Sequence, residues 1–231
     1  MENYSTTRVV EQSMVASLFK STYMQMAAAL TVTALTAFFL SESLSFQLMI
    51  INNPSIMWIA IFAELGVVMW LSARLFSMSM TSATLLFILY SVLNGVTLSV
   101  IFLIYEMDVI ATTFGVTAGM FFVTSLIGYI TRMNLSKLGS VFMMLLIGII
   151  IATVVNIFVG SETLYWIITY VGVIVFVGLT AYDTNKLKQL YLEHGDNGEA
   201  GQKLALMGAL TLYLDFINLF LFLLRIFGDR R

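Results

Sequence analysis

Seven long apolar runs follow one another along the chain and occupy most of its length. Their approximate limits are 23–40, 56–76, 82–104, 109–130, 139–160, 164–184 and 204–227. Each run is close to or above the roughly 20 apolar residues with which an α-helix crosses a hydrocarbon core. The pattern therefore predicts an all-α integral membrane protein with seven transmembrane helices. A cytoplasmic N-terminal tail (1–22) would precede this transmembrane domain (23–228), and a short C-terminal tail (229–231) would follow it.

The last apolar run, residues 204–227, is the one around which we expect the others to be organised. It carries a carboxylate, Asp215, near its middle. An ionised aspartate at the centre of a membrane helix costs about 3 kcal/mol, so Asp215 should face protein or water rather than lipid. Gly208, Thr211 and Asn218 share its helical face. We therefore predict that six helices surround this central seventh helix.

Composition supports a membrane protein and removes several kinds of site. Of the 231 residues, 60% are hydrophobic and 10% are charged, against about 25% charged in soluble domains. There is no cysteine, and the single histidine, His194, lies in a polar segment, which excludes disulfides and cysteine- or histidine-based metal clusters. The first residues lack the apolar core and cleavage site of a signal peptide. We expect no cofactor and no nucleic-acid partner.

The distribution of lysine and arginine predicts the orientation. The links 41–55, 105–108 and 161–163 contain neither residue. Eight of the eleven basic residues fall on the opposite side: Arg8, Lys20, Arg74, Arg132, Lys137, Lys186, Lys188 and Lys203. The positive-inside rule then puts the N-terminus in the cytoplasm. Seven crossings leave the C-terminus outside, although three arginines lie near it. A re-entrant last segment is the alternative.

Four ionisable residues lie within or at the ends of the apolar runs: Glu64, Arg74, Asp183 and Asp215. Ionisable residues inside a membrane are candidates for function by default. The structural alternatives are a hydrogen-bonded Glu64, a snorkelling Arg74 and an Asp183 at a solvated helix end. From the limits of the apolar runs, Asp183 lies near the cytoplasmic surface and Asp215 near mid-depth of the membrane. They meet only if the sixth helix slides inward and the seventh enters the membrane near Gly208.

Small and polar residues at helical spacing indicate helix contacts. Gly115 and Gly119 form a small-xxx-small pattern that permits close backbone approach. Ser91, Asn94 and Thr97 share one face of the third run, where hydrogen bonds between helices are expected. The candidates for a pore lining or an internal polar network are Glu64, Asn94, Thr211 and Asn218.

Two stretches resemble the Bax inhibitor family, the transmembrane Bax-inhibitor-motif proteins. They are VGVIVFVGLTAYDTNKLK (171–188) and GALTLYLDFINLFLFLLRIFG (208–228), and the likeness is greatest to the bacterial inner-membrane branch. The resemblance implies a multi-pass inner-membrane protein that acts as a pH-sensitive calcium leak channel. It also implies that Asp183 and Asp215 are a paired-aspartate pH sensor that binds calcium transiently, with Arg74 as a basic partner. Calcium, protons and the bilayer would be its partners.

Two classes of membrane enzyme can be compared with this chain by the residues that they require. An intramembrane aspartyl protease needs Gly-x-Gly-Asp, whereas this chain has Leu212-Tyr-Leu-Asp215. A rhomboid-type enzyme needs a membrane histidine, which is absent from the runs. We therefore expect no enzyme. The alternatives that stay open are a proton-coupled transporter and a non-transporting scaffold that regulates partner membrane proteins.

Overall fold

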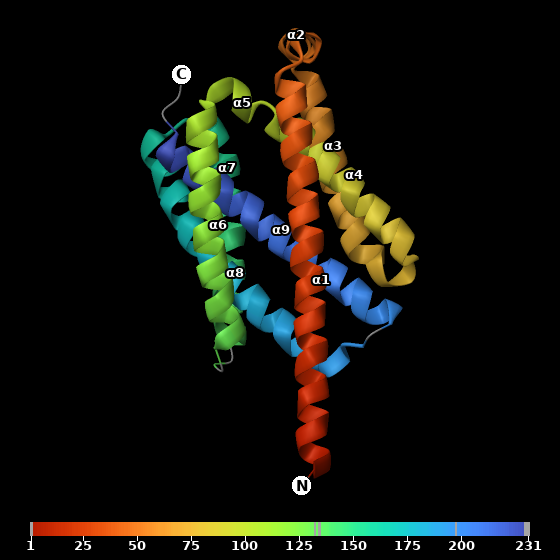
Figure 1. Ribbon diagram of the computed structural model, residues 1–231. Coiled ribbons are helices and arrows are strands. Elements are labelled where there is room, and N and C mark those ends of the chain that lie inside the picture. Colours follow the sequence, from red (N-terminus) through yellow and green to blue (C-terminus); the bar gives the residue numbers. More distant parts are fainter. Residues whose placement is uncertain (1, 132, 134, 197, 229–231) are drawn as a thin grey trace. The chain divides into compact units, whose positions relative to one another are not determined.

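The computed structural model describes residues 2–131, 133, 135–196 and 198–228, with side chains from Gln12 onward. Within these residues the chain is helical and has no strand. The elements are α1 (Glu2–Ser41), α2 (Leu44–Asn52), α3 (Ser55–Arg74), the short 3-10 helix η1 (Leu75–Ser77), α4 (Met80–Leu98), α5 (Ile101–Ile104), α6 (Met107–Ile130), α7 (Ser136–Val159), α8 (Glu162–His194) and α9 (Glu199–Phe227) (Figure 1).

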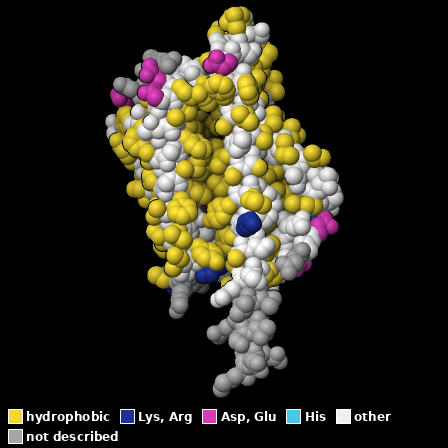
Figure 2. Space-filling view, viewed as in Figure 1, with side chains coloured by type: hydrophobic (Ala, Val, Ile, Leu, Met, Phe, Trp, Pro, Cys, Tyr) yellow, Lys and Arg dark blue, Asp and Glu magenta, His cyan; other side chains and the backbone are white. Residues whose placement is uncertain are grey.

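Seven helical segments of the described chain are long and apolar enough to cross a membrane. They are Gln12–Ser41, Ser55–Ser77, Met80–Ile104, Met107–Ile130, Ser136–Val159, Glu162–His194 and Glu199–Phe227. The prediction of an all-α protein with seven membrane-spanning helices is confirmed. Figure 2 shows the surface that such a protein presents to a bilayer, because most of the visible side chains are hydrophobic.

Three helices are longer than the apolar runs that predicted them. Residues 2–22, expected as a tail, form the first half of α1, and Val15, Leu18 and Phe19 within it are buried. The sixth membrane helix, α8, continues to His194, and α9 begins at Glu199. The extension of α8 carries the fully buried Tyr191, whose hydroxyl lies 2.7 Å from the Thr22 hydroxyl. Polar contacts therefore prolong these helices past the ends of their apolar runs.

The chain divides into two compact units. Of the residues that the structure describes, unit 1 comprises those within 2–106 and 191–213, and unit 2 those within 107–190 and 214–228. The helices α8 and α9 each contribute residues to both units. Each unit has its own packing.

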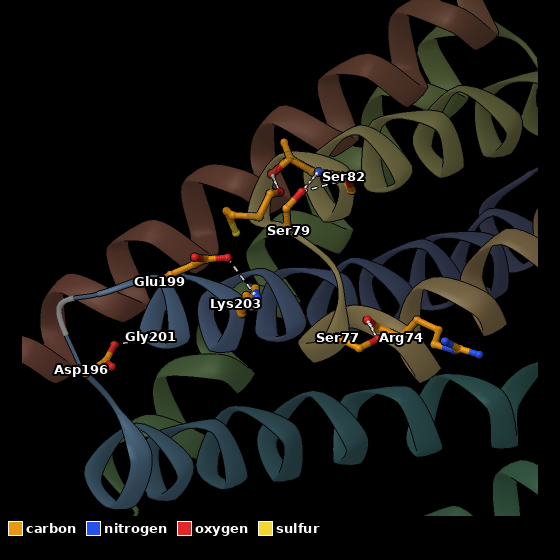
Figure 3. A network of polar contacts seen from close by, with 10 residues as sticks. Arg74, Ser77, Ser79, Ser82, Asp196, Glu199, Gly201 and Lys203 are labelled. Atoms are coloured by element: carbon orange, nitrogen blue, oxygen red, sulfur yellow. Dashed lines mark hydrogen bonds and ion pairs between the residues drawn. The ribbon is translucent and has the colours of Figure 1, made fainter.

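In unit 1, α4 packs against both α1 and α3, and the three helices run side by side in Figure 1. Gly95 permits the close approach of α4 to α1. A Cβ atom at Gly95 would lie 2.6 Å from the Cβ of Thr36 and 2.7 Å from the carbonyl oxygen of Thr33. Ser79 caps the start of α4 by accepting a hydrogen bond from the N–H of Ser82 (Figure 3).

In unit 2, the second half of α9 packs against residues of α6, α7 and α8. Its Leu219, Phe222 and Leu223 form an apolar cluster with Ile149 of α7 and Val175, Phe176 and Leu179 of α8. Phe121 of α6 meets Phe216 edge to face, with the ring centroids 5.5 Å apart. A large apolar area is buried at these contacts, and aromatic pairs of this geometry add to its effect.

The helix α9 is the most buried of the seven spans. Of its apolar stretch 72% is buried inside the protein, against 6% for Ser55–Ser77 and for Ser136–Val159. This burial agrees with the expectation that the last helix is enclosed by others. The arrangement of six helices around it stays a prediction.

The prediction of a close helix contact at Gly115 and Gly119 is wrong. Nothing in the described chain lies within 4 Å of a Cβ built at either glycine. The glycine of α6 that does permit close approach is Gly128, where a Cβ would lie 2.3 Å from the carbonyl oxygen of Ala181 on α8. All three glycines are small residues on α6, and the rotation of this helix about its axis decides which of them faces a neighbouring helix.

Candidate functional site: a buried aspartate pair and a glutamate network

Asp183 lies inside α8 and not at its end, because the helix continues for eleven residues to His194. The turn that carries Asp183 is held against α6 by polar contacts of the two residues that follow it. The Thr184 hydroxyl lies 3.0 Å from that of Ser125. The side-chain amide of Asn185 donates to the carbonyl oxygen of Gly128 at 3.2 Å. These bonds and the tight approach at Gly128 fix the position of Asp183.

The second aspartate, Asp215, comes from the interior of α9 and meets Asp183 within unit 2. The two carboxyl groups are hydrogen-bonded to each other. Asp215 is only 5% exposed, and its Oδ2 has no hydrogen-bond partner among the described residues. A hydrogen bond between two carboxyl groups requires a proton on one of them. We call Asp183 and Asp215 the aspartate pair; their meeting, left open by the sequence, is present in the structure.

A basic group that acts electrostatically on Asp183 is Lys186, three residues further along α8. Its Nζ atom lies 5.9 Å from the ring centroid of Tyr182. Lys186 is exposed at the surface of the protein. Among the expectations drawn from the sequence, this residue counted toward the orientation of the chain.

The basic partner expected from the resemblance, Arg74, belongs to unit 1. It is exposed at the end of α3 and forms no ion pair with any acidic residue that the structure describes. Its carbonyl oxygen accepts a hydrogen bond of 2.9 Å from the Ser77 hydroxyl (Figure 3). A contact between Arg74 and the aspartate pair stays a prediction.

The polar segment before α9 also serves a local purpose in unit 1. The Oδ1 atom of Asp196 accepts hydrogen bonds from the N–H groups of Gly198 (3.0 Å) and Gly201 (2.6 Å), which caps the start of α9. One turn later Lys203 forms an ion pair of 3.0 Å with Glu199, and Figure 3 shows both features.

Thr211 and Asn218, predicted to share a polar stripe with Asp215, bond to their own helix. The Thr211 hydroxyl donates to the carbonyl oxygen of Met207 at 3.1 Å, and the Asn218 amide donates to that of Leu214 at 2.8 Å. Both side chains are half-buried. Their donors are therefore used within α9 and do not satisfy Asp215.

A second polar group lies in unit 1 and centres on Glu64 in the middle of α3. Its Oε1 accepts a hydrogen bond from the side-chain amide of Asn94, and its Oε2 accepts one of 2.9 Å from the Thr97 hydroxyl. Tyr90, also on α4, is hydrogen-bonded to the same carboxylate. Three donors on one face of α4 thus converge on Glu64, which confirms the prediction that Asn94 and Thr97 join helices.

From Asn94 the hydrogen bonds continue across the unit. The Tyr213 hydroxyl of α9 donates to the Asn94 Oδ1 at 2.9 Å, and the Thr33 hydroxyl of α1 lies 2.6 Å from that of Tyr213. We call Glu64, Tyr90, Asn94, Thr97, Tyr213 and Thr33 the Glu64 network. It links α1, α3, α4 and α9. Sequence reasoning missed Tyr90, Tyr213 and Thr33, although a tyrosine in the middle of a membrane helix needs a partner for its hydroxyl.

The aspartate pair offers carboxylate oxygens, which are the ligands that calcium prefers. Calcium usually takes six to eight oxygen ligands, and two carboxylates supply at most four. No group of three or more histidine, cysteine or acidic residues gathers within the described chain. Two carboxylates alone therefore fall short of a full set of calcium ligands.

Together these features define a class: a helical membrane protein with seven spans and a hydrogen-bonded pair of carboxyl groups, one of them buried, between its last two helices. The family model described as "Inhibitor of apoptosis-promoting Bax1" matches residues 15–231. The chain belongs to this family, the Bax inhibitor family.

Bacterial relatives cover most of the chain. It is 48% identical over 211 residues to the inner membrane protein YbhL of Escherichia coli K12, covering 90% of each chain. It is 43% identical over 206 residues to an uncharacterized protein of Borreliella burgdorferi, covering 89% of each. It is 37% identical over 232 residues to an uncharacterized protein of Deinococcus radiodurans, covering 100% of this chain and 98% of the other.

Proposed function

We propose that the protein is a pH-sensitive leak channel for calcium, gated by protonation of the aspartate pair. The observation that carries this proposal is the contact between Asp183 and Asp215 in the interior of unit 2. A hydrogen-bonded pair of carboxyl groups gains or loses a proton as pH changes. Its charge then changes at a contact between two membrane helices, where charge is costly. The choice of calcium rests on the family resemblance and on the oxygen chemistry of the pair.

In the proposed mechanism, loss of the shared proton at high pH leaves the pair more negative. The pair then attracts a basic partner, for which we propose Arg74, and this attraction closes the path. Protonation at low pH weakens the attraction and opens the path. Lys186 acts on Asp183 as well, so it contributes to the same balance. A difference of about 1.4 kcal/mol between the open and closed states corresponds to a tenfold change in their ratio.

The test is calcium flux into liposomes that contain the purified protein and a calcium dye, measured from pH 8 to pH 6. We expect wild type to leak at pH 6 and to be closed at pH 8. Asp183→Asn and Arg74→Ala should both leak at pH 8 as wild type does at pH 6. Asp108→Asn, which removes an exposed carboxylate at the start of α6, is the matched control and should behave as wild type. If both variants stay closed and pH-responsive, the gating model is wrong.

A proton-coupled transporter is the second candidate, and the Glu64 network favours it. Glu64 at its centre is an ionisable residue inside a membrane span, and carboxylates at such positions take part in the proton relays of transporters. The same liposomes distinguish the candidates. A transporter would couple calcium flux to proton flux, whereas a channel would pass calcium down its gradient without proton movement. A scaffold would pass neither ion at any pH.

The relative in Escherichia coli carries the name of an inner membrane protein. We propose the same location for this chain, with several crossings and a cytoplasmic N-terminus. We propose no catalytic activity and no resident cofactor. The partners in this proposal are the lipid bilayer, calcium ions and protons.

A further inference from the structure

A pocket of about 520 Å³ lies in unit 2, where α7 ends, α8 begins and α9 comes to its last turn. Its lining includes one cation, Arg225, and one carboxylate, Glu162, together with the aromatic residues Tyr165 and Trp166. The size lies within the range of pockets that hold small molecules, about 300–1,000 Å³. None of these residues belongs to the aspartate pair or to the Glu64 network.

The floor of the pocket is a tight, well-bonded turn between α7 and α8. Gly160 ends α7 with a positive φ of 65°, a conformation that glycine adopts without strain. The side-chain oxygen of Asn156 accepts a hydrogen bond of 3.0 Å from the N–H of Ser161. The Ser161 hydroxyl in turn accepts one of 3.3 Å from the N–H of Leu164, which caps α8. The backbone here is therefore held in place without a ligand.

Arg225 is held against two aromatic rings. Its guanidinium carbon lies 5.6 Å from the ring centroid of Tyr165 and 5.1 Å from that of Phe222. These are distances at which a cation is attracted to a ring face. Arg225 is half-buried, and it forms no ion pair with an acidic residue of the described chain. Its donors are thus positioned but are not neutralised by a carboxylate.

Glu162 carries the opposite charge and is exposed. It too forms no ion pair within the described part of the chain. The pocket therefore presents a cation and an anion that are not paired with each other. A purely anionic ligand would be attracted by Arg225 and repelled by Glu162. A ligand that carries both charges a short distance apart would satisfy both residues.

The depth of the pocket in the membrane follows from the helix ends that form it. The span of α7 ends at Val159, that of α8 begins at Glu162, and that of α9 ends at Phe227. Helix ends lie at the level of the lipid headgroups, and tryptophan and tyrosine gather there. Trp166 meets Tyr165 edge to face at 5.6 Å and stacks on Tyr170 at 5.8 Å, which is such a group.

We propose that this pocket binds the phosphoethanolamine headgroup of a membrane phospholipid. The phosphodiester would accept hydrogen bonds from Arg225, and the ammonium group would lie at Glu162. Tyr165 and Trp166 would pack beside the glycerol backbone at the interface. Arginine is suited to the first contact because its planar donors match phosphate oxygens. The proposal holds whether or not the protein conducts calcium.

Native mass spectrometry of the purified protein with added lipids tests this assignment. Wild type should retain phosphatidylethanolamine in preference to phosphatidylglycerol. Arg225→Gln should lose about tenfold in affinity for both lipids, the effect of one charge-assisted hydrogen bond. Glu162→Gln, at an exposed position, should fold normally and lose only the preference. The charge-matched controls Lys137→Gln and Asp108→Asn, both exposed residues of unit 2, should retain wild-type behaviour.

A second measurement locates the lipid. In a Trp58→Phe/Trp70→Phe variant, which removes two exposed tryptophans, Trp166 is the one remaining. Brominated phosphatidylethanolamine should quench its fluorescence more than brominated phosphatidylglycerol, and Glu162→Gln should abolish the difference. Soluble phosphoethanolamine should compete weakly, because it lacks the acyl chains. Equal binding of the two lipids by wild type, or full retention of both by Arg225→Gln, would overturn the proposal. A preference for phosphatidylglycerol would do the same.

Discussion

Asn94 connects two parts of the Glu64 network, because its side-chain amide is used on both sides. The amide nitrogen donates to Glu64, and the amide oxygen accepts from Tyr213. An amide is suited to this place because it carries both a donor and an acceptor. Asn94 is 5% exposed and Tyr213 is fully buried, so water cannot replace the lost bonds.

We predict that Asn94→Leu lowers the free energy of unfolding by about 1–3 kcal/mol. The substitution leaves a buried tyrosine hydroxyl without its acceptor and removes a donor from a carboxylate. The measurement is denaturation of the detergent-solubilised protein, followed by circular dichroism. Ser82→Ala, at the exposed start of α4, serves as the control and should change stability little. A stability loss equal to that of the control would show that the network does not hold the helices together.

A substitution of Asp215 tests directly whether the aspartate pair senses pH. Asp215→Leu removes a buried carboxyl group whose Oδ2 has no partner within the described residues, so the fold should survive. We expect calcium flux in liposomes to lose its dependence on pH, because the pair no longer exchanges a proton. Asn218→Leu, on the same helix, should keep that dependence, since its amide bonds only to the backbone of α9. If the flux of a folded Asp215→Leu protein keeps its pH dependence, Asp215 is not part of the pH sensor.

At the scale of helices, the contact between α6 and α8 decides where Asp183 lies. The two backbones come close at Gly128 and Ala181, and Asn185 and Lys188 of α8 donate to carbonyl oxygens at the end of α6. These donors replace water at the end of α6 and prolong the α8 helix beyond its apolar run. The aspartate is thereby brought from the expected helix end into the helix interior.

Gly128→Ala should therefore be destabilising by about 1–3 kcal/mol, the usual effect of an overpacked contact. The added Cβ would lie 2.3 Å from a backbone oxygen, and backbone cannot move aside as a side chain does. Gly119→Ala on the same helix is the matched control. Nothing lies within 4 Å of its Cβ, and alanine favours a helix over glycine by about 1 kcal/mol. In thermal denaturation the melting temperature should fall for Gly128→Ala and rise for Gly119→Ala. Equal changes in the two variants would contradict the close contact of α6 with α8 at Gly128.

At the scale of the whole molecule, the seven apolar runs predict an odd number of crossings, and the basic residues of the links place the N-terminus in the cytoplasm. The seven helical segments of sufficient length agree with that number. The length of α9, 29 residues, exceeds what a crossing needs. A helix of this length favours full crossing over re-entry.

We therefore expect a reporter fused after Arg231 to be located outside the cytoplasm. An alkaline phosphatase fusion should be active there and a green fluorescent protein fusion dark. Fusions in the link between α7 and α8 should give the same result, and those between α8 and α9 the opposite one. A fluorescent C-terminal fusion would contradict seven crossings and would favour the re-entrant last segment.

The class of the protein, the number of its spans and the candidate site residues could all be predicted from the amino-acid sequence. These depend on local properties: the length of an apolar run, the charge of a link and the cost of a carboxylate in lipid. Two stretches of sequence also pointed to the family, which the comparisons confirm. The same reasoning placed the end of α8 at 184 instead of 194 and the start of α1 at 23 instead of 2, because apolar runs do not record polar contacts.

Which of these residues meet could not be predicted from the sequence and is seen in the packing of the helices. It joined Asp183 to Asp215, gave Glu64 its partners on α4, and chose Gly128 over Gly119 as the close contact of α6. Each of these outcomes depends on the rotation of a helix about its axis and on its depth relative to a neighbour. A change of one residue in either moves a side chain by about 100° or 1.5 Å, and no single run of sequence specifies that relation between two helices.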